Sequence, residues 1–589
     1  MSVQRLLIAF ALLAPGARAE DESRLFLDAI DVHVVNVEVM VTDGDGLPVT
    51  GLTAADFELL EDGRKVALSN FYAVEGGEIP GAAGAPSAAG EDPGAVGAAD
   101  APRVETRGLR LVILVDEANL STRNRNALFH NLERYLRDEL EPGDQVMLVR
   151  MKDSVETVHG FTDRPEDLLP ALDRMAGDLG RFAQWEGERR RFLTQLRNAS
   201  LPYPPRSEDA AEDRAFDGAI NTALKLAGDA RSLAERSSRR SRRAARALSE
   251  LTDSLAGLAG RKAVLYLSDG LATRGDSLIQ AWLAKYEQWI LTNDVPYLMQ
   301  EISALDSFGY DATRELRELV ERATANRVAF YPISNAGRGS SLASVEYRGA
   351  GSASDVASFA VEARGRESAL LELAAGTGGI AFTRTADVDG LLERLRRDFD
   401  TFYSLGYNSP ASEDGELHEI EVKVRQQRKG LEVRHFEGFR EKDPFARLRD
   451  LTLSALEYSV EDNPLEVRLA PGEQVETGED RYRVEVILRI PYRKLLLLPE
   501  GGYHIGRVSA CVVARDDRGR TSPAARIELP IRVPNDRILQ ATTGTAAYPI
   551  QLEMRPGPQR LAVGVRDQLG GTDATVHVDL VVGERDQGG

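Results

Sequence analysis

Two acidic residues stand directly after two apolar, strand-like segments that lie far apart in the sequence. Asp116 follows Leu-Val-Ile-Leu-Val at 111–115, and Asp269 follows Ala-Val-Leu-Tyr-Leu-Ser at 263–268. In a parallel α/β sheet, the residues just beyond the strand ends line the ligand crevice. We therefore expect the two carboxylates to point into one shared site.

The residues around these acids decide what chemistry the site supports. Mg²⁺ and Ca²⁺ prefer several hard oxygen ligands. Side-chain oxygens are offered by Asp116 and Asp269, together with Asn119, Ser121, Ser268 or Glu117. Ala118 and Leu120 offer none. We therefore expect a metal-free site, or weak binding of Mg²⁺ or Ca²⁺ through the two acids and water. Without a metal, two close carboxylates would repel and raise one pKa. The simpler alternative is that both acids cap strand ends and form turns.

The elements that position these acids alternate between strands and helices over residues 108–405. Apolar runs predict strands at 110–116, 145–151, 262–268 and 328–333, with an edge strand at 155–161. Helices are expected at 124–140, 166–179, about 214–258, 311–325 and 388–402, where Leu391, Leu392, Leu395 and Phe399 share one face. Such alternation predicts a doubly wound, mainly parallel sheet. Three insertions interrupt it, near 180–212, 272–308 and 335–355.

Segments rich in β-branched residues flank this α/β region. Residues 20–75 predict a β module with an Asp-Gly turn at 43–46. Residues 76–107 consist largely of Gly, Ala and Pro and predict a linker. A β extension is expected at 406–440 and a β-sandwich-like domain at 445–589, where short strands alternate with Pro/Gly turns.

The N-terminus has the pattern of a secretory signal peptide at 1–19. Arg5 precedes an apolar run at 6–13, and Ala17-Arg-Ala19 forms a small-residue cleavage site. The protein is therefore expected to be exported, to the periplasm or beyond the cell, after cleavage near Ala19. The apolar run of this segment is too short to span a bilayer, and no later stretch is long and apolar enough to predict a transmembrane helix. With a single cysteine, Cys511, no internal disulfide can form, and we expect this residue in a buried strand.

The charge distribution limits the classes of partner. A net charge of −20 argues against general nucleic-acid binding, which needs clustered Lys and Arg. The local exception is the basic run Arg-Arg-Ser-Arg-Arg at 239–243, followed by Arg246. On a helix this run predicts a solvated surface, and the alternative is a patch for an anionic partner.

Five short motifs give the chain a family resemblance. They are Val-Thr-Asp-Gly-Asp-Gly-Leu-Pro-Val at 41–49, Asp-Phe-Glu-Leu-Leu-Glu-Asp-Gly at 56–63, Gly-Arg-Lys-Ala-Val-Leu-Tyr-Leu-Ser-Asp-Gly at 260–270, Gly-Thr-Gly-Gly at 376–379 and Tyr-Ser-Leu-Gly-Tyr at 403–407. With these motifs the chain resembles bacterial exported proteins related to the von Willebrand factor A (vWA) domain. The resemblance covers about residues 29–440 and implies a protein-interaction module; it does not imply catalysis.

The same resemblance implies a metal-dependent adhesion site that is degenerate in this chain. In the family, an Asp-x-Ser-x-Ser loop and a later Asp hold a divalent cation that accepts a partner's carboxylate. Asp116 and Asp269 match the two acids, whereas Ala118 and Leu120 replace the serines. A threonine loop should precede the long helix, where Asp217-Gly218 and Asn221-Thr222 are the only candidates.

These observations favour an exported, non-catalytic protein that binds protein partners. No P-loop, nucleophile elbow, Rossmann glycine fingerprint or zinc-ligand cluster is present in the sequence. One alternative is a structural scaffold or spacer in an envelope complex that works without metal. A hydrolase with an unrecognised site is the second alternative.

Overall fold

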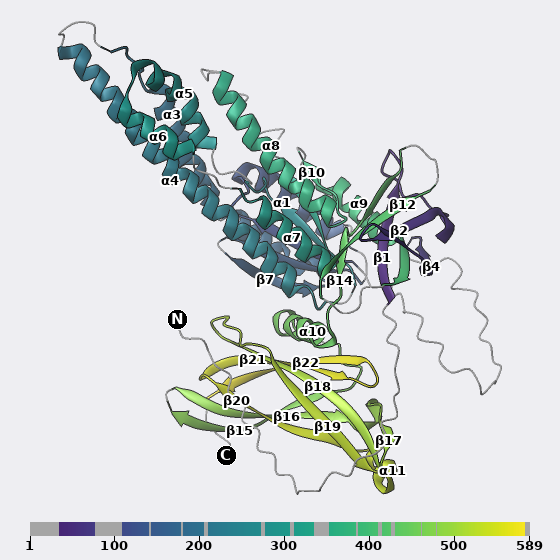
Figure 1. Ribbon diagram of the computed structural model, residues 1–589. Helices are drawn as coiled ribbons and strands as arrows, with labels where there is room; N and C mark the ends of the chain where they lie inside the picture. Colours follow the sequence, from purple (N-terminus) through teal and green to yellow (C-terminus); the bar gives the residue numbers. More distant parts are fainter. Residues whose placement is uncertain are drawn as a thin grey trace.

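The computed structural model of the chain describes residues 34–76, 109–138, 140, 143–152, 154–177, 181–204, 210–258, 260–272, 277–306, 311–334, 353–383, 387–409, 415–425, 430–460, 462–478 and 480–583. The signal peptide predicted at 1–19, most of the linker predicted at 76–107 and most of the insertion predicted near 335–355 lie outside these residues. The described part is mixed α/β (Figure 1).

A six-stranded mixed sheet forms the centre of the α/β domain, which spans residues 109–400. Its order is β10-β9-β8-β5-β6-β7, and only β7 runs antiparallel to its neighbour, so the predicted edge strand is confirmed. The inner strands are continuous apolar runs because helices cover both of their faces. The strands are β5 (Arg110–Asp116), β6 (Gln145–Met151), β7 (Val155–Thr162), β8 (Lys262–Leu267), β9 (Val328–Ser334) and β10 (Phe382–Thr383).

Two helical layers enclose the sheet. One hydrophobic core holds α1 (Thr122–Asp138), α2 (Leu169–Gly177) and α9 (Val388–Asp400) against one face. In α9 the predicted face is confirmed: Leu391, Leu392 and Leu395 are buried, and Phe399 packs against the same core while only partly buried. A second core joins the other face to the C-terminal half of α4, to α7 (Thr313–Ala325) and to α8 (Ala353–Gly376). The sheet is therefore covered on both sides.

Four helices form an arm that extends away from the sheet (Figure 1). The segments predicted as insertions near 180–212 and 272–308 supply α3 (Arg181–Asn198), α5 (Ser277–Asn293) and α6 (Pro296–Asp306). These pack on the N-terminal half of α4 (Ala210–Ser254), which continues into the α/β domain. Trp282 is fully buried in the arm and donates a hydrogen bond from Nε1 to the Ala223 carbonyl at 3.0 Å. The helical arm therefore has a core of its own.

Strands from both sides of the α/β domain build one N-terminal sandwich. Its two sheets have the orders β13-β1-β11-β4 and β14-β12-β2-β3 and enclose a common core. Segments 34–74 and 402–440 contribute strands to both sheets, so the predicted β module and β extension are parts of one unit. The strands are β1 (Val34–Thr42), β2 (Phe57–Glu61), β3 (Arg64–Val66), β4 (Leu68–Val74), β11 (Phe402–Asn408), β12 (Leu417–Val424), β13 (Glu432–His435) and β14 (Gly438–Arg440).

A second sandwich forms the C-terminal part. Sheet β15-β16-β20 faces sheet β17-β18-β21-β22, with β19 also paired to β18, across one core. Cys511 is buried in β18, as predicted. The strands are β15 (Arg468–Gly478), β16 (Arg481–Pro491), β17 (Leu498–Glu500), β18 (Tyr503–Asp516), β19 (Ala525–Pro534), β20 (Thr545–Met554), β21 (Gly557–Asp567) and β22 (Thr572–Val582), and a short helix α11 (Ile538–Ala541) follows β19.

The C-terminal part, predicted as β-sandwich-like from residue 445 onward, begins with a helix that the strand pattern did not predict. Helix α10 (Pro444–Tyr458) opens this part and lies between the C-terminal sandwich and the α/β domain (Figure 1). Asp443 caps it by accepting hydrogen bonds from the backbone nitrogens of Phe445 and Ala446, each at 2.9 Å. Among the helices of the described residues, none is both long and apolar enough to cross a bilayer.

Candidate functional site

Asp116 lies at the carboxyl end of β5 in a dense set of hydrogen-bond donors. Its Oδ2 accepts from the Tyr266 hydroxyl at 2.6 Å, the Asn119 amide at 2.9 Å and the Ser268 hydroxyl at 3.0 Å. Its Oδ1 accepts from the Asn119 backbone nitrogen at 3.0 Å. The side chain is fully buried. Both oxygens of the carboxylate therefore already have protein donors.

Asp269 lies beyond the end of the neighbouring strand, β8, and is satisfied in the same way. Its Oδ1 accepts from the Asn124 amide at 2.6 Å, and its Oδ2 accepts from the Ser121 backbone nitrogen at 2.9 Å. Its own backbone nitrogen donates to the Asn119 carbonyl at 3.0 Å. Because β5 and β8 are adjacent and parallel, the two acids lie at one edge of the sheet, and Asn119 is hydrogen-bonded to both.

The other residues predicted for the site divide into two groups. Asn119, Ser121 and Ser268 join the hydrogen-bond network of the acids. Glu117 instead pairs with Lys152, whose Nζ lies 3.2 Å from Glu117 Oε2. Leu120 is buried in the core between β5 and α1. In this loop, the predicted ligand Glu117 therefore faces Lys152, and Leu120 faces the hydrophobic core.

The predicted threonine-loop candidates are wrong. Asp217, Gly218, Asn221 and Thr222 all lie inside the long helix α4. The Thr222 hydroxyl donates to the Gly218 carbonyl at 2.7 Å, within the same helix. This half of α4 belongs to the helical arm, so these residues are remote from the two acids.

Burial raises the pKa of both acids. The pKa of Asp116 lies above its ordinary value because burial disfavours the charged form, although the bonds from Tyr266, Asn119 and Ser268 oppose this. Burial also raises the pKa of Asp269, against the effect of its bonds to Ser121 and Asn124. The predicted rise in pKa is present, but its main cause is loss of water contact and not repulsion between the carboxylates.

The donor set around the acids does not fit a divalent cation. Such an ion needs several oxygen lone pairs directed at one point. Here the four carboxylate oxygens accept N–H and O–H groups of the protein, and Ala118 and Leu120 offer no side-chain oxygen to complete a shell. Over the part of the chain that the structure describes, no three His, Cys, Asp or Glu side chains cluster as metal ligands. This edge of the sheet forms a polar network held by hydrogen bonds.

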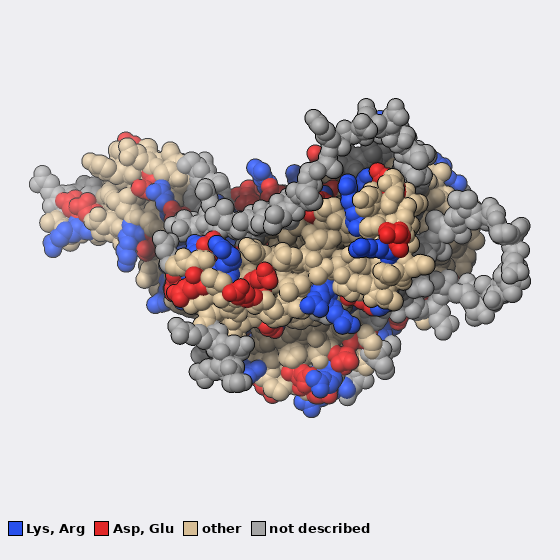
Figure 2. Space-filling model, turned by 90° about the horizontal axis from the view of Figure 1, so that it is seen from below, with Lys and Arg blue, Asp and Glu red and all other residues tan. Residues whose placement is uncertain are grey.

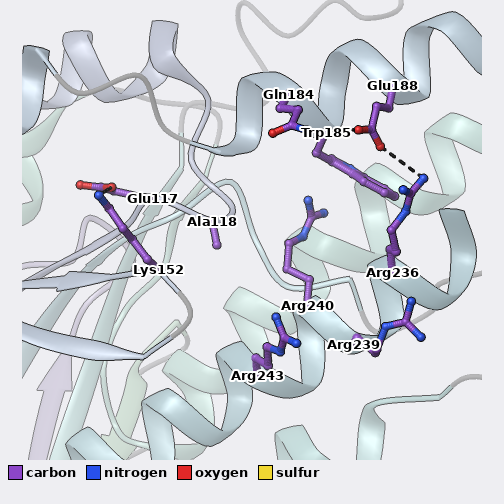
Figure 3. Close-up of a pocket in the computed structure, with 10 residues that line it drawn as sticks. All are labelled: Glu117, Ala118, Lys152, Gln184, Trp185, Glu188, Arg236, Arg239, Arg240 and Arg243. Carbon is purple, nitrogen blue, oxygen red and sulfur yellow. Dashed lines mark hydrogen bonds and ion pairs between the residues drawn. The ribbon is translucent and has the colours of Figure 1, made fainter.

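A pocket of about 390 Å³ opens directly beside this network (Figure 3). Ala118 lies on its floor, next to the ion pair of Glu117 and Lys152. The other lining residues belong to the part of the helical arm that lies next to the sheet. They are Gln184, Trp185 and Glu188 on α3, and Arg236, Arg239, Arg240 and Arg243 on α4. We call it the arginine pocket. It joins the loop after β5, the end of β6 and the arm.

The side chains of the arginine pocket are held by stacking and ion pairs. The Arg240 guanidinium lies over the Trp185 ring, 4.6 Å from its centroid (Figure 3). Arg236 pairs with Glu188 at 3.2 Å, and Arg239 pairs with Glu235 at 3.5 Å. On the face of the molecule drawn in Figure 2, by contrast, basic and acidic side chains lie in small mixed groups. Among the described residues that line the arginine pocket, basic side chains outnumber acidic ones.

Sequence reasoning missed the residues that only the fold brings to the site. Tyr266 could have been found, because it stands two positions before Ser268 and so shares a strand face with it. Asn124 and Asp269 are 145 residues apart in the sequence, and no pattern links them. Trp185 lies in a segment predicted only as an insertion. The arginine run was noticed, but its position beside Ala118 was not predicted.

No protein-family model matches the chain, and no curated protein is significantly similar to it.

Proposed function

We propose that this chain is an exported, non-catalytic protein-interaction protein built on a vWA-like α/β domain. In this proposal, partners approach the sheet edge that carries Asp116 and Asp269, and the metal-dependent adhesion site is degenerate. The main support for this proposal is the position of the two acids, which follow the first and fourth strands of the α/β domain and lie at the same edge of the sheet. There, amide and hydroxyl groups donate hydrogen bonds to their carboxylate oxygens.

The state of the two acids supports a role in binding and not in catalysis. A general base needs a free lone pair within reach of a substrate proton. Asp116 is fully buried, and both of its oxygens are engaged by neighbours on the loop and on β8. Asp269 holds Asn124 and Ser121 in place. These hydrogen bonds tie the loop that carries Ala118, which lines the pocket, to the end of the adjacent strand.

A structural scaffold or spacer is the second candidate. It is favoured by the buried contacts between the α/β domain and its neighbours, including a bidentate pair between Arg434 of β13 and Asp398 of α9. A spacer needs such joints, whereas a binding module needs an accessible face. The two functions predict different results when this edge of the sheet is blocked: a binding module loses its partners, whereas a scaffold keeps them.

Affinity capture from a cell-envelope extract tests the proposal. The full chain is used as bait, with and without EDTA, beside the variants Ala118→Trp and Ala210→Trp. Ala118→Trp fills the floor of the pocket, whereas Ala210 is exposed at the distal start of α4, about 39 Å along the helix from Arg236. We expect the same partners with and without EDTA, their loss in Ala118→Trp and their retention in Ala210→Trp.

Two outcomes would contradict the proposal. If EDTA removes the partners, adhesion depends on metal in spite of the hydrogen-bond network. If Ala118→Trp retains all partners, the sheet edge is not the binding face, and the scaffold function is favoured.

A further inference from the structure

The arginine pocket has a charge opposite to that of the whole chain. Among the described residues that line it, five are basic (Lys152 and four arginines) and two are acidic (Glu117 and Glu188). The chain as a whole has a net charge of −20. A cavity of about 390 Å³ can enclose one or two side chains of a partner. An excess of guanidinium groups around such a cavity selects anions with planar, bidentate geometry.

We propose that the arginine pocket binds the carboxylates of a short acidic segment of a partner protein. This inference deepens the proposed function and rests on it. It assigns to Arg236, Arg239, Arg240 and Arg243 the recognition of the acid, with no metal ion involved. It also selects the anionic-partner interpretation of the arginine run over the solvated-surface interpretation.

The existing ion pairs of these arginines are weak enough to be exchanged. The side chains of Arg236 and Arg239 are 47% and 55% exposed, and their partners Glu188 and Glu235 are 27% and 46% exposed. Ion pairs with this degree of exposure contribute little to stability, because water screens them. An incoming carboxylate can therefore share or replace these contacts at low cost. The same pairs hold the guanidinium groups at the rim before a ligand arrives.

The pocket is better suited to a short acidic segment than to a long polyanion. Glu117 and Glu188 border it on two sides, and they repel a ligand that carries charge along its whole length. Ala118 gives the floor a small apolar surface, and the Trp185 ring under Arg240 forms a wall. Such a lining fits a few methylene groups that end in carboxylates. Nucleic acid would extend beyond the pocket onto a chain of strong negative charge.

Fluorescence anisotropy with a defined probe tests the inference. The probe is a fluorescein-labelled peptide, Gly-Ser-Glu-Glu-Asp-Glu-Ser-Gly, and its control has Gln and Asn in place of the acids. Both are titrated with the full chain at about 20 mM and about 150 mM NaCl, because salt screens exposed charges. We expect the acidic peptide to bind at least roughly tenfold more tightly than its amide control at the lower salt.

Two arginines of α4 provide a matched pair of variants. Arg243 lines the pocket, whereas Arg246, three residues later, is exposed outside it. Charge reversal changes the net charge equally in both, and neither side chain belongs to a buried core. We expect Arg243→Glu to weaken binding of the acidic peptide roughly tenfold and Arg246→Glu to weaken it less than about threefold.

Trp185 supplies a second readout inside the pocket. The other two tryptophans, Trp282 and Trp289, are buried in the helical arm, so a fluorescence change on binding reports the stack with Arg240. We expect the acidic peptide to change the emission of the wild-type chain and not that of Trp185→Phe. Circular dichroism of each variant shows that it is folded.

Three results would overturn the inference. The amide peptide could bind as well as the acidic one, or Arg246→Glu could weaken binding as much as Arg243→Glu. Tripolyphosphate or an oligonucleotide could bind more tightly than the peptide at the higher salt, which would make the ligand a polyphosphate. If Arg243→Glu keeps its envelope partners while Ala118→Trp loses them, this inference fails and the proposed function stands. If no partner is captured by any form, the proposed function fails.

Discussion

At the scale of single residues, two asparagines determine the character of the sheet edge. The Asn124 amide lies 2.6 Å from Asp269 Oδ1, and the Asn119 amide lies 2.9 Å from Asp116 Oδ2. Each donates to a buried carboxylate and so meets the requirement that buried polar groups be paired. The acids thereby become acceptors that fasten the loop after β5 to the end of β8. Their role in stability can be measured separately from any role in binding.

Replacing Asp116 with alanine should destabilise the protein. The change removes the acceptor of four hydrogen bonds and leaves the Tyr266 and Ser268 hydroxyls buried without it. We expect the free energy of unfolding to fall by about 2–4 kcal/mol. Urea denaturation measures this loss, and it should be the same with and without millimolar Mg²⁺ or Ca²⁺. An ion that raises the unfolding midpoint of the wild type but not of Asp116→Ala would reveal a metal site.

Lys262 should make stability depend on pH. It is buried at the start of β8, and burial, together with the nearby Arg327 and Lys442, lowers its pKa from 10.5 to about 7. Between these two values the unfolded chain binds the proton and the folded chain does not, so stability rises with pH. The slope can reach about 1.4 kcal/mol per pH unit.

Urea denaturation of the wild type and of Lys262→Met between about pH 7.5 and pH 9.5 measures this slope. We expect the wild type to gain stability relative to the variant as the pH rises. Equal slopes in the two proteins would show that Lys262 keeps its ordinary pKa in the folded chain.

At the scale of secondary-structure elements, one buried ion pair joins the N-terminal sandwich to the α/β domain. Arg434 on β13 donates two hydrogen bonds to Asp398 on α9, at 2.7 and 2.5 Å. The Tyr331 hydroxyl of β9 donates to the same carboxylate at 3.1 Å. Arg261 reinforces the joint by pairing with Glu38 of β1 at 2.7 Å. Side chains from both units therefore share one polar cluster.

Breaking one side of this pair should cost more than removing both sides. Arg434→Met leaves the Asp398 carboxylate buried without its main partner, and we expect a loss of about 3–5 kcal/mol. The double variant Arg434→Met with Asp398→Leu also removes the buried, unpaired carboxylate. It should therefore recover part of the lost free energy of unfolding. Thermal and urea unfolding of the two single variants and the double variant form the test. A double variant no more stable than Arg434→Met would contradict it.

The sequence predicted those elements whose pattern lies within one short segment, and it did not predict contacts between distant segments. The runs that became β5, β8 and β9 are buried on both faces, so they were visible as apolar blocks. Helix α10 was missed, although Asp443 and Pro444 mark its start, because strand patterns dominate on both sides of it. The pairing of β1 with β11 joins positions about 370 residues apart in the chain, and alternation within a strand carries no information about its partner.

At the scale of the whole molecule, the C-terminal sandwich is attached through α10 to the end of α4. The Gly257 backbone nitrogen donates to the Ser454 hydroxyl at 3.1 Å, and that hydroxyl donates to the Ser254 carbonyl at 2.7 Å. A Cβ added to Gly257 would lie 2.2 Å from the Asp450 carbonyl oxygen. This close backbone contact depends on the absence of a side chain at Gly257.

Gly257→Ala should therefore loosen the C-terminal part. The methyl group collides with the backbone of α10, and we expect a larger radius of gyration and faster proteolysis near residue 460. Gly228→Ala is the matched control, since a Cβ there meets nothing within 4 Å and alanine favours the helix by about 1 kcal/mol. Small-angle scattering and limited chymotrypsin digestion, which can cleave after Tyr458, compare the two. Identical profiles for Gly257→Ala and the wild type would refute the expected disruption.

The pairing of β1 has a consequence for biosynthesis. Val34 faces Asn408, and Thr42 faces Glu432, so both neighbours of this strand emerge from the ribosome only after the whole α/β domain. At about 5–20 residues per second, the strand waits for tens of seconds with its backbone donors and acceptors unpaired. An unpaired apolar strand is a template for association with other chains. Chaperone capture of the nascent N-terminal segment would protect it until translation passes residue 435.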